Sequence, residues 1–227
     1  MNFEEAMNEL RSLGTAQNVK IYSRHGGGDN MFGVSFANLG KLKKRIKVDH
    51  DLALQLWDSG NFDARILAAM IADPAKVTAP LADRWIKDVN NSVVGDQLGS
   101  LLAKSPVAGT KMRQWLKSKK EYVRQVGYVV LTVVLMREND ITDPDLSDML
   151  DTIESEIHGS PNRARHAMNN ALIAIGIYRA SLTAKAIAAA RRIGEVEVDH
   201  GETSCQTPDA IAYIEKALAR NQKRRRC

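Results

Sequence analysis

The chain has 227 residues, of which 44% are hydrophobic and 26% are charged, as in ordinary globular proteins. This composition argues against a disordered chain, and two cysteines are too few for a secreted disulfide scaffold. The formal net charge of +5 is a modest hint of a polyanionic partner.

The sequence contains no segment typical of export or membrane insertion. Its first fifteen residues, MNFEEAMNELRSLGT, are acidic and amphipathic and lack the apolar region of a secretory signal. The most apolar run, Val126–Met136, is well short of the roughly 20 residues that span a bilayer. We therefore expect a cytoplasmic protein without a membrane partner.

The N-terminal part predicts an amphipathic helix followed by a glycine-rich loop. Asn2–Leu13 places apolar residues at helical spacing. In SRHGGGDNMFGVS, the backbone N–H groups of Gly26, Gly27 and Gly28 could cradle a phosphate, or the glycines could form only a tight interhelix loop. The nucleotide-binding patterns GxxxxGKS and GxxxxGKT are absent, so we expect no nucleotide cofactor.

Residues that commonly cap helices mark the elements that follow. Pro80 falls in the first turn of one of them, where proline is tolerated. The predicted starts are Ser35, Asp49, Asn61 or Asp63, Thr78, and Asn91 or Ser92. Later helices are predicted at Val107–Ser118, Glu121–Glu138, Asp143–Ile157, from Ser160–Pro161 to Arg179, at Ala180–Ile193, and at Pro208–Arg220 with Thr207 as its cap.

The predicted fold class is all-α. About eleven or twelve helices joined by short loops, with no convincing strand, indicate antiparallel helix pairs stacked side by side. The unit length of about 35 to 45 residues is in the range of HEAT-like repeats. We expect residues 1–227 to form a single, monomeric HEAT-like solenoid, curved with a concave groove, with a short basic tail at about 220–227.

Basic residues gather at several predicted helix starts and ends. In KLKKRIK, residues 41–47, five cations cover a helix whose apolar stripe is Leu39, Leu42 and Ile46. One such block is usually a solvated face, but its recurrence favours a polyanion-binding surface. Three more blocks are KSKKEYVR at 117–124, NRAR at 162–165 and KRRR at 223–226.

Few side chains offer catalytic or ligand-binding chemistry. Asp96, in WIKDVNNSVVGDQL, follows a small polar run and a glycine, and read alone it is either a structural carboxylate or a reagent. His166, Asn169 and Asn170 are polar groups on an otherwise apolar helix, where they bind a neighbouring helix end, a phosphate or a ligand. The Asp199–Cys205 loop holds metal-ligand residue types without the paired spacing of a zinc site, so we expect no metal.

Three phrases make the sequence similar to a known family. RHGGGDNMFGVSFANLGKLKKRIK, LALQLWDSGNFDARILAAMIADP and VDHGETSCQTPDAIAYI resemble the DNA alkylation repair family of HEAT-like-repeat proteins, whose characterised members include alkylpurine DNA glycosylases. The similarity runs from about Lys20 to Tyr213. LWDSGNFDARILAAMIADP is its most diagnostic stretch.

The resemblance implies a helical solenoid whose basic concave face holds duplex DNA, with an aspartate directed at the deoxyribose of a damaged nucleotide. Asp96 falls at that aspartate, and Arg124 corresponds to a residue that holds a backbone phosphate. An N3- or N7-alkylated purine leaves as a neutral base. One carboxylate that stabilises an oxocarbenium-like sugar and positions water therefore suffices, without a cofactor.

The chain departs from the glycosylase pattern at three positions. The resemblance places tryptophans of active members where this chain has Ser92 and Asn170, and an arginine where it has Ile173. Those tryptophans stack against a cationic nucleotide, and each contact contributes roughly 0.5 to 2 kcal/mol. Their loss supports a non-enzymatic alternative, in which the protein recognises distorted or branched DNA by its shape.

Three hypotheses follow: an alkylpurine DNA glycosylase with Asp96 as its catalytic residue, a shape-selective DNA binder, and a helical scaffold for an acidic protein or small molecule. The polar candidates in the groove are His166, Asn169 and Asn170. The predicted DNA-binding residues are Lys41, Lys43, Lys44, Arg45, Lys47, Arg124, Arg163 and Arg165.

Overall fold

The computed structural model describes residues 1–137 and 141–226, and for 222–226 it describes the backbone alone. Within these ranges the chain forms thirteen α-helices, and its one extended pairing is an isolated bridge between Gly14 and Val34. The prediction of an all-α fold is confirmed. Contacts divide the chain into two compact units: unit 1 is Met1–Arg113 with His200–Ser204, and unit 2 is Gln114–Asp199 with the residues from Cys205 onward.

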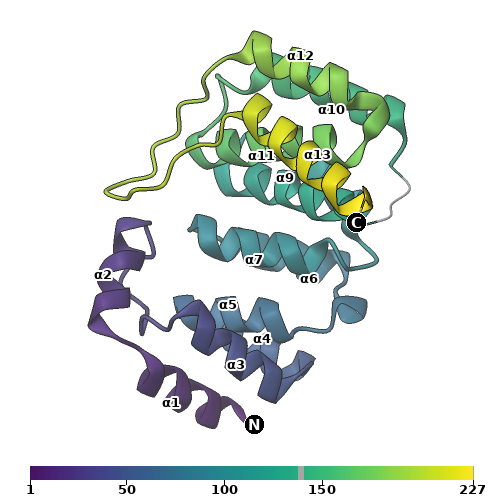
Figure 1. Cartoon of the computed structure of the whole chain (residues 1–227). Coiled ribbons are helices and arrows are strands. Elements are labelled where there is room, and N and C mark those ends of the chain that lie inside the picture. The colour runs from purple at the N-terminus through teal and green to yellow at the C-terminus, as the bar shows by residue number, and fades with distance from the viewer. Residues whose placement is uncertain (138–140, 227) are drawn as a thin grey trace. The chain divides into compact units, whose positions relative to one another are not determined.

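Figure 1 labels the helices in chain order. Unit 1 holds α1 (Phe3–Leu13), α2 (Ala16–Arg24), α3 (Phe36–Ile46), α4 (His50–Asp58), α5 (Phe62–Ile71), α6 (Ala79–Trp85) and α7 (Ser92–Leu102). Unit 2 holds α9 (Glu121–Leu135), α10 (Asp143–Glu156), α11 (Asn162–Tyr178), α12 (Thr183–Ile193) and α13 (Ala210–Arg226), and the boundary falls within α8 (Ala108–Trp115). Short 3-10 helices occupy Pro74–Lys76, Ile86–Asp88 and Ala180–Leu182.

Side-chain caps start five helices at residues that the sequence predicted. In each case a side-chain oxygen accepts a hydrogen bond from a first-turn N–H group, which has no partner within the helix. The caps are Ser35, Asp49, Asn61, Thr78 and Asn91, so the alternatives at two starts, Asp63 and Ser92, lie inside their helices.

The structure differs from the sequence prediction at two helices. Ala16–Arg24, which was not predicted to be helical, forms α2 with Thr15 as its cap. The last helix begins at Ala210, and Asp209 rather than Thr207 accepts a hydrogen bond from the N–H of Ala212, at 2.7 Å. A carboxylate accepts this bond well at a helix start, since it also interacts favourably with the helix dipole.

Hydrogen bonds between side chains reveal the repeat length. In unit 2, Arg192 binds Glu154, 38 residues earlier in the chain. In unit 1, the indole N–H of Trp57 donates to Asp88, 31 residues later. Contacts between neighbouring repeats thus join residues 31 to 38 positions apart, as in proteins built from stacked helical repeats.

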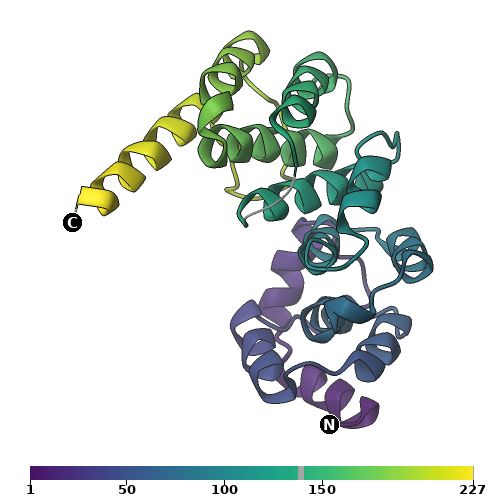
Figure 2. The same ribbon diagram turned by 90° about the vertical axis from the view of Figure 1, so that its right-hand side faces the viewer.

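Each unit is built around one central helix. In unit 1, α5 packs against α3, α4 and α7. In unit 2, α11 packs against α9, α12 and α13, while α10 packs on α12 (Figure 1). The C-terminal part of α13 extends away from the helices on which its first turns pack (Figure 2). Packing in each unit thus links three helices in a row: α3, α5 and α7 in unit 1, and α9, α11 and α13 in unit 2.

Helix α11 lies in the core of unit 2. Met168, Leu172 and Ile175 are buried almost completely, and burial of such a side chain stabilises the fold by about 1.5 to 3 kcal/mol. No single helix in the described ranges has the length and hydropathy of a membrane span. Asn162–Tyr178 and Ala180–Ile193 have this length and hydropathy only when taken together, and the pair is bent by 113°.

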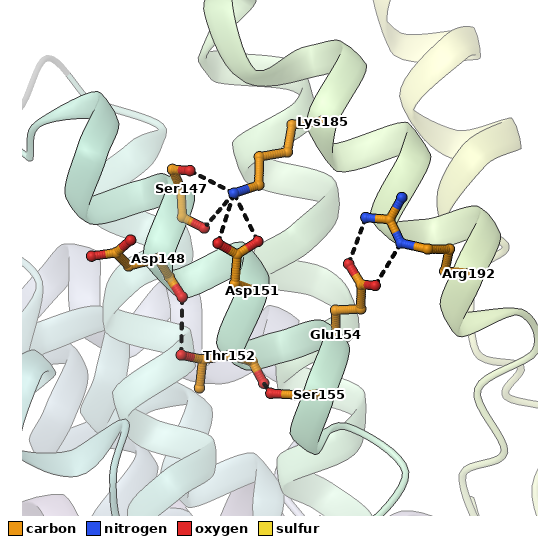
Figure 3. A network of polar contacts seen from close by, with 8 residues as sticks. All are labelled: Ser147, Asp148, Asp151, Thr152, Glu154, Ser155, Lys185 and Arg192. Atoms are coloured by element: carbon orange, nitrogen blue, oxygen red, sulfur yellow. Dashed lines mark hydrogen bonds and ion pairs between the residues drawn. The ribbon is translucent and has the colours of Figure 1, made fainter.

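Charged side chains connect α10 to α12. Lys185 Nζ lies 2.8 Å from Asp151 Oδ2 and 2.6 Å from Ser147 Oγ, and the guanidinium of Arg192 binds Glu154 through two nitrogens, at 2.5 and 2.7 Å (Figure 3). Exposed ion pairs of this kind contribute at most about 1 kcal/mol each. The network therefore specifies the register of the two helices more than it stabilises them.

The glycine-rich loop is held to α5 by a buried carboxylate. Asp63 is 0% exposed and accepts hydrogen bonds from the backbone N–H groups of Phe32, Gly33 and Val34, at 2.6, 3.1 and 2.8 Å. The hydroxyl of Tyr22 donates to the carbonyl of Val34, and burial, then the charge of Asp63, raises the pKa of this tyrosine. These three N–H groups thus bind a carboxylate of the protein itself.

We expect Asp63→Ala to lower the free energy of unfolding by about 3 kcal/mol or more, because three backbone N–H groups would lose their acceptor. Asp51→Ala removes an exposed carboxylate from the first turn of α4 and should cost less than about 1 kcal/mol. Urea denaturation measures both variants. Equal losses of stability would contradict the anchoring role of Asp63.

Candidate nucleic-acid interface

The basic helix α3 lies on the surface of unit 1. Leu39 and Leu42 are buried, and Ile46 is half-buried, as the predicted apolar stripe requires. Arg45 forms an ion pair with Glu9 of α1, whereas none of the other cations of this group is ion-paired to a described residue. All five predicted cations are exposed, namely Lys41, Lys43, Lys44, Arg45 and Lys47.

The helix dipole explains only part of this charge. Lys43, Lys44 and Arg45 lie in the last turn of α3, where the exposed carbonyl groups favour a cation by about 0.3 to 1 kcal/mol. Lys41 lies earlier in the helix, and Lys47 is the residue that follows it. The helix dipole therefore does not account for Lys41 and Lys47.

Asp96 lies on the exposed side of α7. The helix is capped by Asn91, whose Oδ1 accepts from the N–H of Val93 at 2.8 Å and whose Nδ2 donates to the carbonyl of His25 at 2.9 Å. Ser92 and Ser100 are one helical turn before and after Asp96, so the three residues share a face. This face of α7 carries Ser92 at the position where stacking against a damaged nucleotide would require an aromatic ring.

Arg124 is buried, with 3% of its surface exposed. Its guanidinium donates to Ser160 Oγ at 3.0 Å, forms an ion pair with Glu156, and lies 5.9 Å from the ring centre of Tyr128. The hydrogen bond from Arg124 is the main cause that lowers the pKa of Glu156, whereas burial raises the pKa of Tyr128. In this structure Arg124 joins α9 to the end of α10, and its contact with a phosphate stays a prediction.

Two other predicted residues hold the segment that leads from α12 to α13. Arg165 donates to the carbonyls of Ser160 and Glu197, at 3.1 and 2.9 Å. Asn169 is 2% exposed and donates to the carbonyl of Pro208 at 2.9 Å. Of the three roles predicted for Asn169, this hydrogen bond corresponds to binding of a neighbouring helix end. The remaining predicted residues of α11, Arg163, His166 and Asn170, are half-buried.

The Asp199–Cys205 loop is fixed by its backbone. Asn162 binds both the N–H and the carbonyl of Asp199, each at 2.7 Å. Gly201 has a φ of 68°, and a side chain there would collide with the carbonyl of Arg24, so glycine is required. Among the described residues, no group of three His, Cys, Asp or Glu side chains is placed to hold a metal ion.

Sequence reasoning missed the partners of the buried arginine. Glu156 and Ser160 are 32 and 36 residues from Arg124 along the chain. No local pattern connects residues so far apart. The repeat length itself is the one available signal, because it predicts which residues of the next repeat lie beside α9.

Comparison with known proteins places this helical architecture in a family. Residues 6–214 match the family described as DNA alkylation repair enzyme. The chain belongs to the DNA alkylation repair family. Two other proteins are similar over nearly their whole length: the uncharacterized protein Lin0241 of Listeria innocua, 31% identical over 97% of this chain and 99% of its own, and the uncharacterized protein Lmo0209 of Listeria monocytogenes, 29% identical over 98% and 100%.

A solved structure gives this member of the DNA alkylation repair family a close structural counterpart. It is described as a new family of proteins related to the HEAT-like repeat DNA glycosylases with affinity for branched DNA structures. The two chains are 32% identical and superpose with a TM-score of 0.89, over 97% of this chain and 95% of the other. The predicted HEAT-like fold is therefore confirmed.

Glu156→Gln should lower the stability of unit 2 near neutral pH by about 1 to 2 kcal/mol, because the buried guanidinium of Arg124 loses its ionised partner. The pKa of Glu156 is lowered by folding from 4.5, so its ionised form stabilises the folded state above about pH 4.5. That stabilisation disappears as the pH falls through the lowered pKa.

The difference in unfolding free energy between wild type and Glu156→Gln should accordingly shrink on acidification below about pH 4.5. Denaturant titrations at a series of pH values measure it. Glu195→Gln, at an exposed position, serves as the control and should differ little from wild type throughout. A difference for Glu156→Gln that grows on acidification would contradict this assignment.

Proposed function

We propose that this protein binds DNA, prefers branched DNA to a linear duplex, and does not excise bases. The observation that carries the proposal is its likeness, over 97% of the chain, to a structure whose family is described as having affinity for branched DNA. Membership of the DNA alkylation repair family supports a DNA partner as well. The exposed cations of α3 supply the electrostatic attraction that such a partner needs.

The charge distribution within unit 2 supports phosphate binding by one row of helices. Helix α10 carries carboxylates and no lysine or arginine along its length, so it repels a phosphate backbone. Two of these carboxylates, Asp151 and Glu154, already neutralise cations of α12. By contrast, Lys119 and Lys120 are exposed before α9, and Lys216 and Arg220 are exposed on α13. The row of α9, α11 and α13 is therefore the favourable side for DNA.

Recognition of shape follows from the kinds of side chain available. Phosphate contacts from lysine and arginine carry no sequence information, but they fix how a nucleic acid lies on a rigid surface. A branch point brings phosphates of several duplex arms close together. Cations carried by a stack of rigid helices can then reach more phosphates than on one straight duplex, and each neutralised phosphate adds affinity through counterion release.

Excision of an alkylated purine is the second candidate function, and the exposed carboxylate of Asp96 favours it. Without aromatic walls at Ser92 and Asn170, however, a flipped nucleotide would lose several kcal/mol of positioning. Such a loss corresponds to a factor of about one hundred or more in rate. We therefore place Asp96 outside the proposed activity.

The protein should bind a four-way DNA junction at least about tenfold more tightly than a linear duplex of the same arm sequence, with both affinities falling steeply as salt rises. Gel retardation over a salt series measures this preference. The variant Lys41→Gln with Lys43→Gln and Lys44→Gln should reduce the slope of log K against log salt by up to about 2.7. Lys76→Gln, which removes an exposed cation outside α3, is the control. Equal affinity for junction and duplex would contradict shape selection, and no retardation at low salt would contradict DNA binding.

Wild type and Asp96→Asn should release no abasic sites from a duplex containing N7-methylguanine, because the walls that hold the nucleotide are absent. Cleavage of the treated duplex in alkali after incubation with excess protein detects a single turnover. Release by wild type that Asp96→Asn abolishes would instead establish the glycosylase function.

A further inference from the structure

Helices α3 and α12 end in the same backbone conformation. Lys47 follows α3 with φ 66° and ψ −125°, and Gly194 follows α12 with φ 71° and ψ −146°. In both, the N–H group donates to the carbonyl four residues earlier, that of Lys43 at 2.8 Å and that of Ala190 at 3.0 Å. The two positions are thus a matched pair, with glycine at one and lysine at the other.

The conformation is strained for lysine. A positive φ brings Cβ close to the neighbouring backbone, and glycine avoids this because it has no Cβ. Wherever else the described chain adopts a positive φ, the residue is glycine, and Lys47 alone departs from this rule. Strained backbone of this kind is concentrated at ligand-binding and active sites, where the surrounding structure holds it in place.

Local packing gives no reason for a lysine at this position. The side chain of Lys47 is exposed, and it makes no hydrogen bond or ion pair with a described residue. The next residue, Val48, is 64% exposed, the highest value among the large hydrophobic residues described. The turn therefore presents its side chains to solvent, and the strain is not offset by contacts within the fold.

The turn is nonetheless rigid, because hydrogen bonds fix it on both sides. The N–H of Lys47 is bound to α3, and the N–H of Asp49 donates to the carbonyl of Ile71 at 2.9 Å. Asp49 also caps α4 by accepting from the N–H of Leu52 at 3.0 Å. The backbone that carries Lys47 is therefore fixed, so binding of its ammonium costs side-chain entropy but little backbone entropy.

We propose that Lys47 binds a DNA backbone phosphate at the rim of the α3 surface, and that this contact maintains lysine where the backbone favours glycine. The inference rests on the proposed DNA-binding function. It adds that the lysine at this position lowers the stability of the fold and raises the affinity for DNA. Replacing Lys47 with glycine should therefore improve the fold and weaken the complex.

Three variants of the full chain separate charge from strain. Lys47→Gly removes both, Lys47→Gln removes the charge alone, and Lys47→Arg keeps both. Thermal unfolding should show a rise of a few degrees in Tm for Lys47→Gly and little change for the other two. Fluorescence anisotropy with a labelled four-way junction should show weaker binding by Lys47→Gly and Lys47→Gln, while Lys47→Arg binds as wild type does.

Salt dependence identifies the contact as a phosphate. Loss of one phosphate contact reduces the slope of log K against log salt by about 0.9. The loss of affinity between about 50 and about 200 mM salt should therefore be about 3.5-fold smaller for Lys47→Gly and Lys47→Gln than for wild type. Lys76→Gln, an equal change of charge outside α3, should leave the slope unchanged.

Gly194→Lys tests the strain by itself, because it places lysine in the matched conformation and should lower Tm. Unchanged junction affinity and salt slope in Lys47→Gly would overturn the inference while the proposed function stands. An equal fall in slope for Lys76→Gln would overturn it too, since the effect would be one of total charge. Failure of wild type to bind any DNA would overturn the proposed function itself.

Discussion

Burial of aliphatic side chains between the helices of neighbouring repeats is the interaction on which the rest of the structure depends. It supplies most of the stabilisation, but it is not directional, so it leaves the register of the helices open. Polar groups set that register. In unit 1 the stacked rings of Trp57 and Trp85, with centres 4.2 Å apart, are buried, and the indole N–H of Trp57 donates to Asp88, 31 residues later. A buried donor such as the Trp57 indole N–H specifies one alignment, because any other would leave it without an acceptor.

The same division of roles governs charge. Carboxylates on α10 pair with cations on α12 and so connect adjacent repeats, as Asp151 does with Lys185. The cations of α3 are mostly without such partners, although they repel one another on a single helix. A fold selected for stability alone would place carboxylates between them. An external anion would reduce this repulsion, and in the proposed function the phosphates of DNA supply it.

The helices could be predicted because their caps bind residues close in sequence. The site could be predicted only in part, because its contacts join residues far apart in sequence. Ser35 and Asn61 cap helices through hydrogen bonds to residues only three positions away, so their role is visible in a short window. Asp63 acts across about 30 residues and Arg124 across 36, so the carboxylate was predicted as an alternative cap and the arginine as a phosphate contact, without its partners in the fold. The exposed cations of α3 were predictable because an amphipathic pattern determines which side of a helix faces water.

A carboxylate alone does not make a glycosylase. Asp96 lies exposed on α7, where water screens its charge and lowers its power to stabilise a cationic sugar. A strong electrostatic effect on that sugar requires walls that exclude water and hold the nucleotide against the carboxylate. Serine at position 92 provides neither a wall nor a stacking surface. Phosphate contacts by exposed lysines need no such enclosure, since counterion release is effective at the surface. Loss of the walls should thus remove excision without removing phosphate contacts, as the proposed function requires.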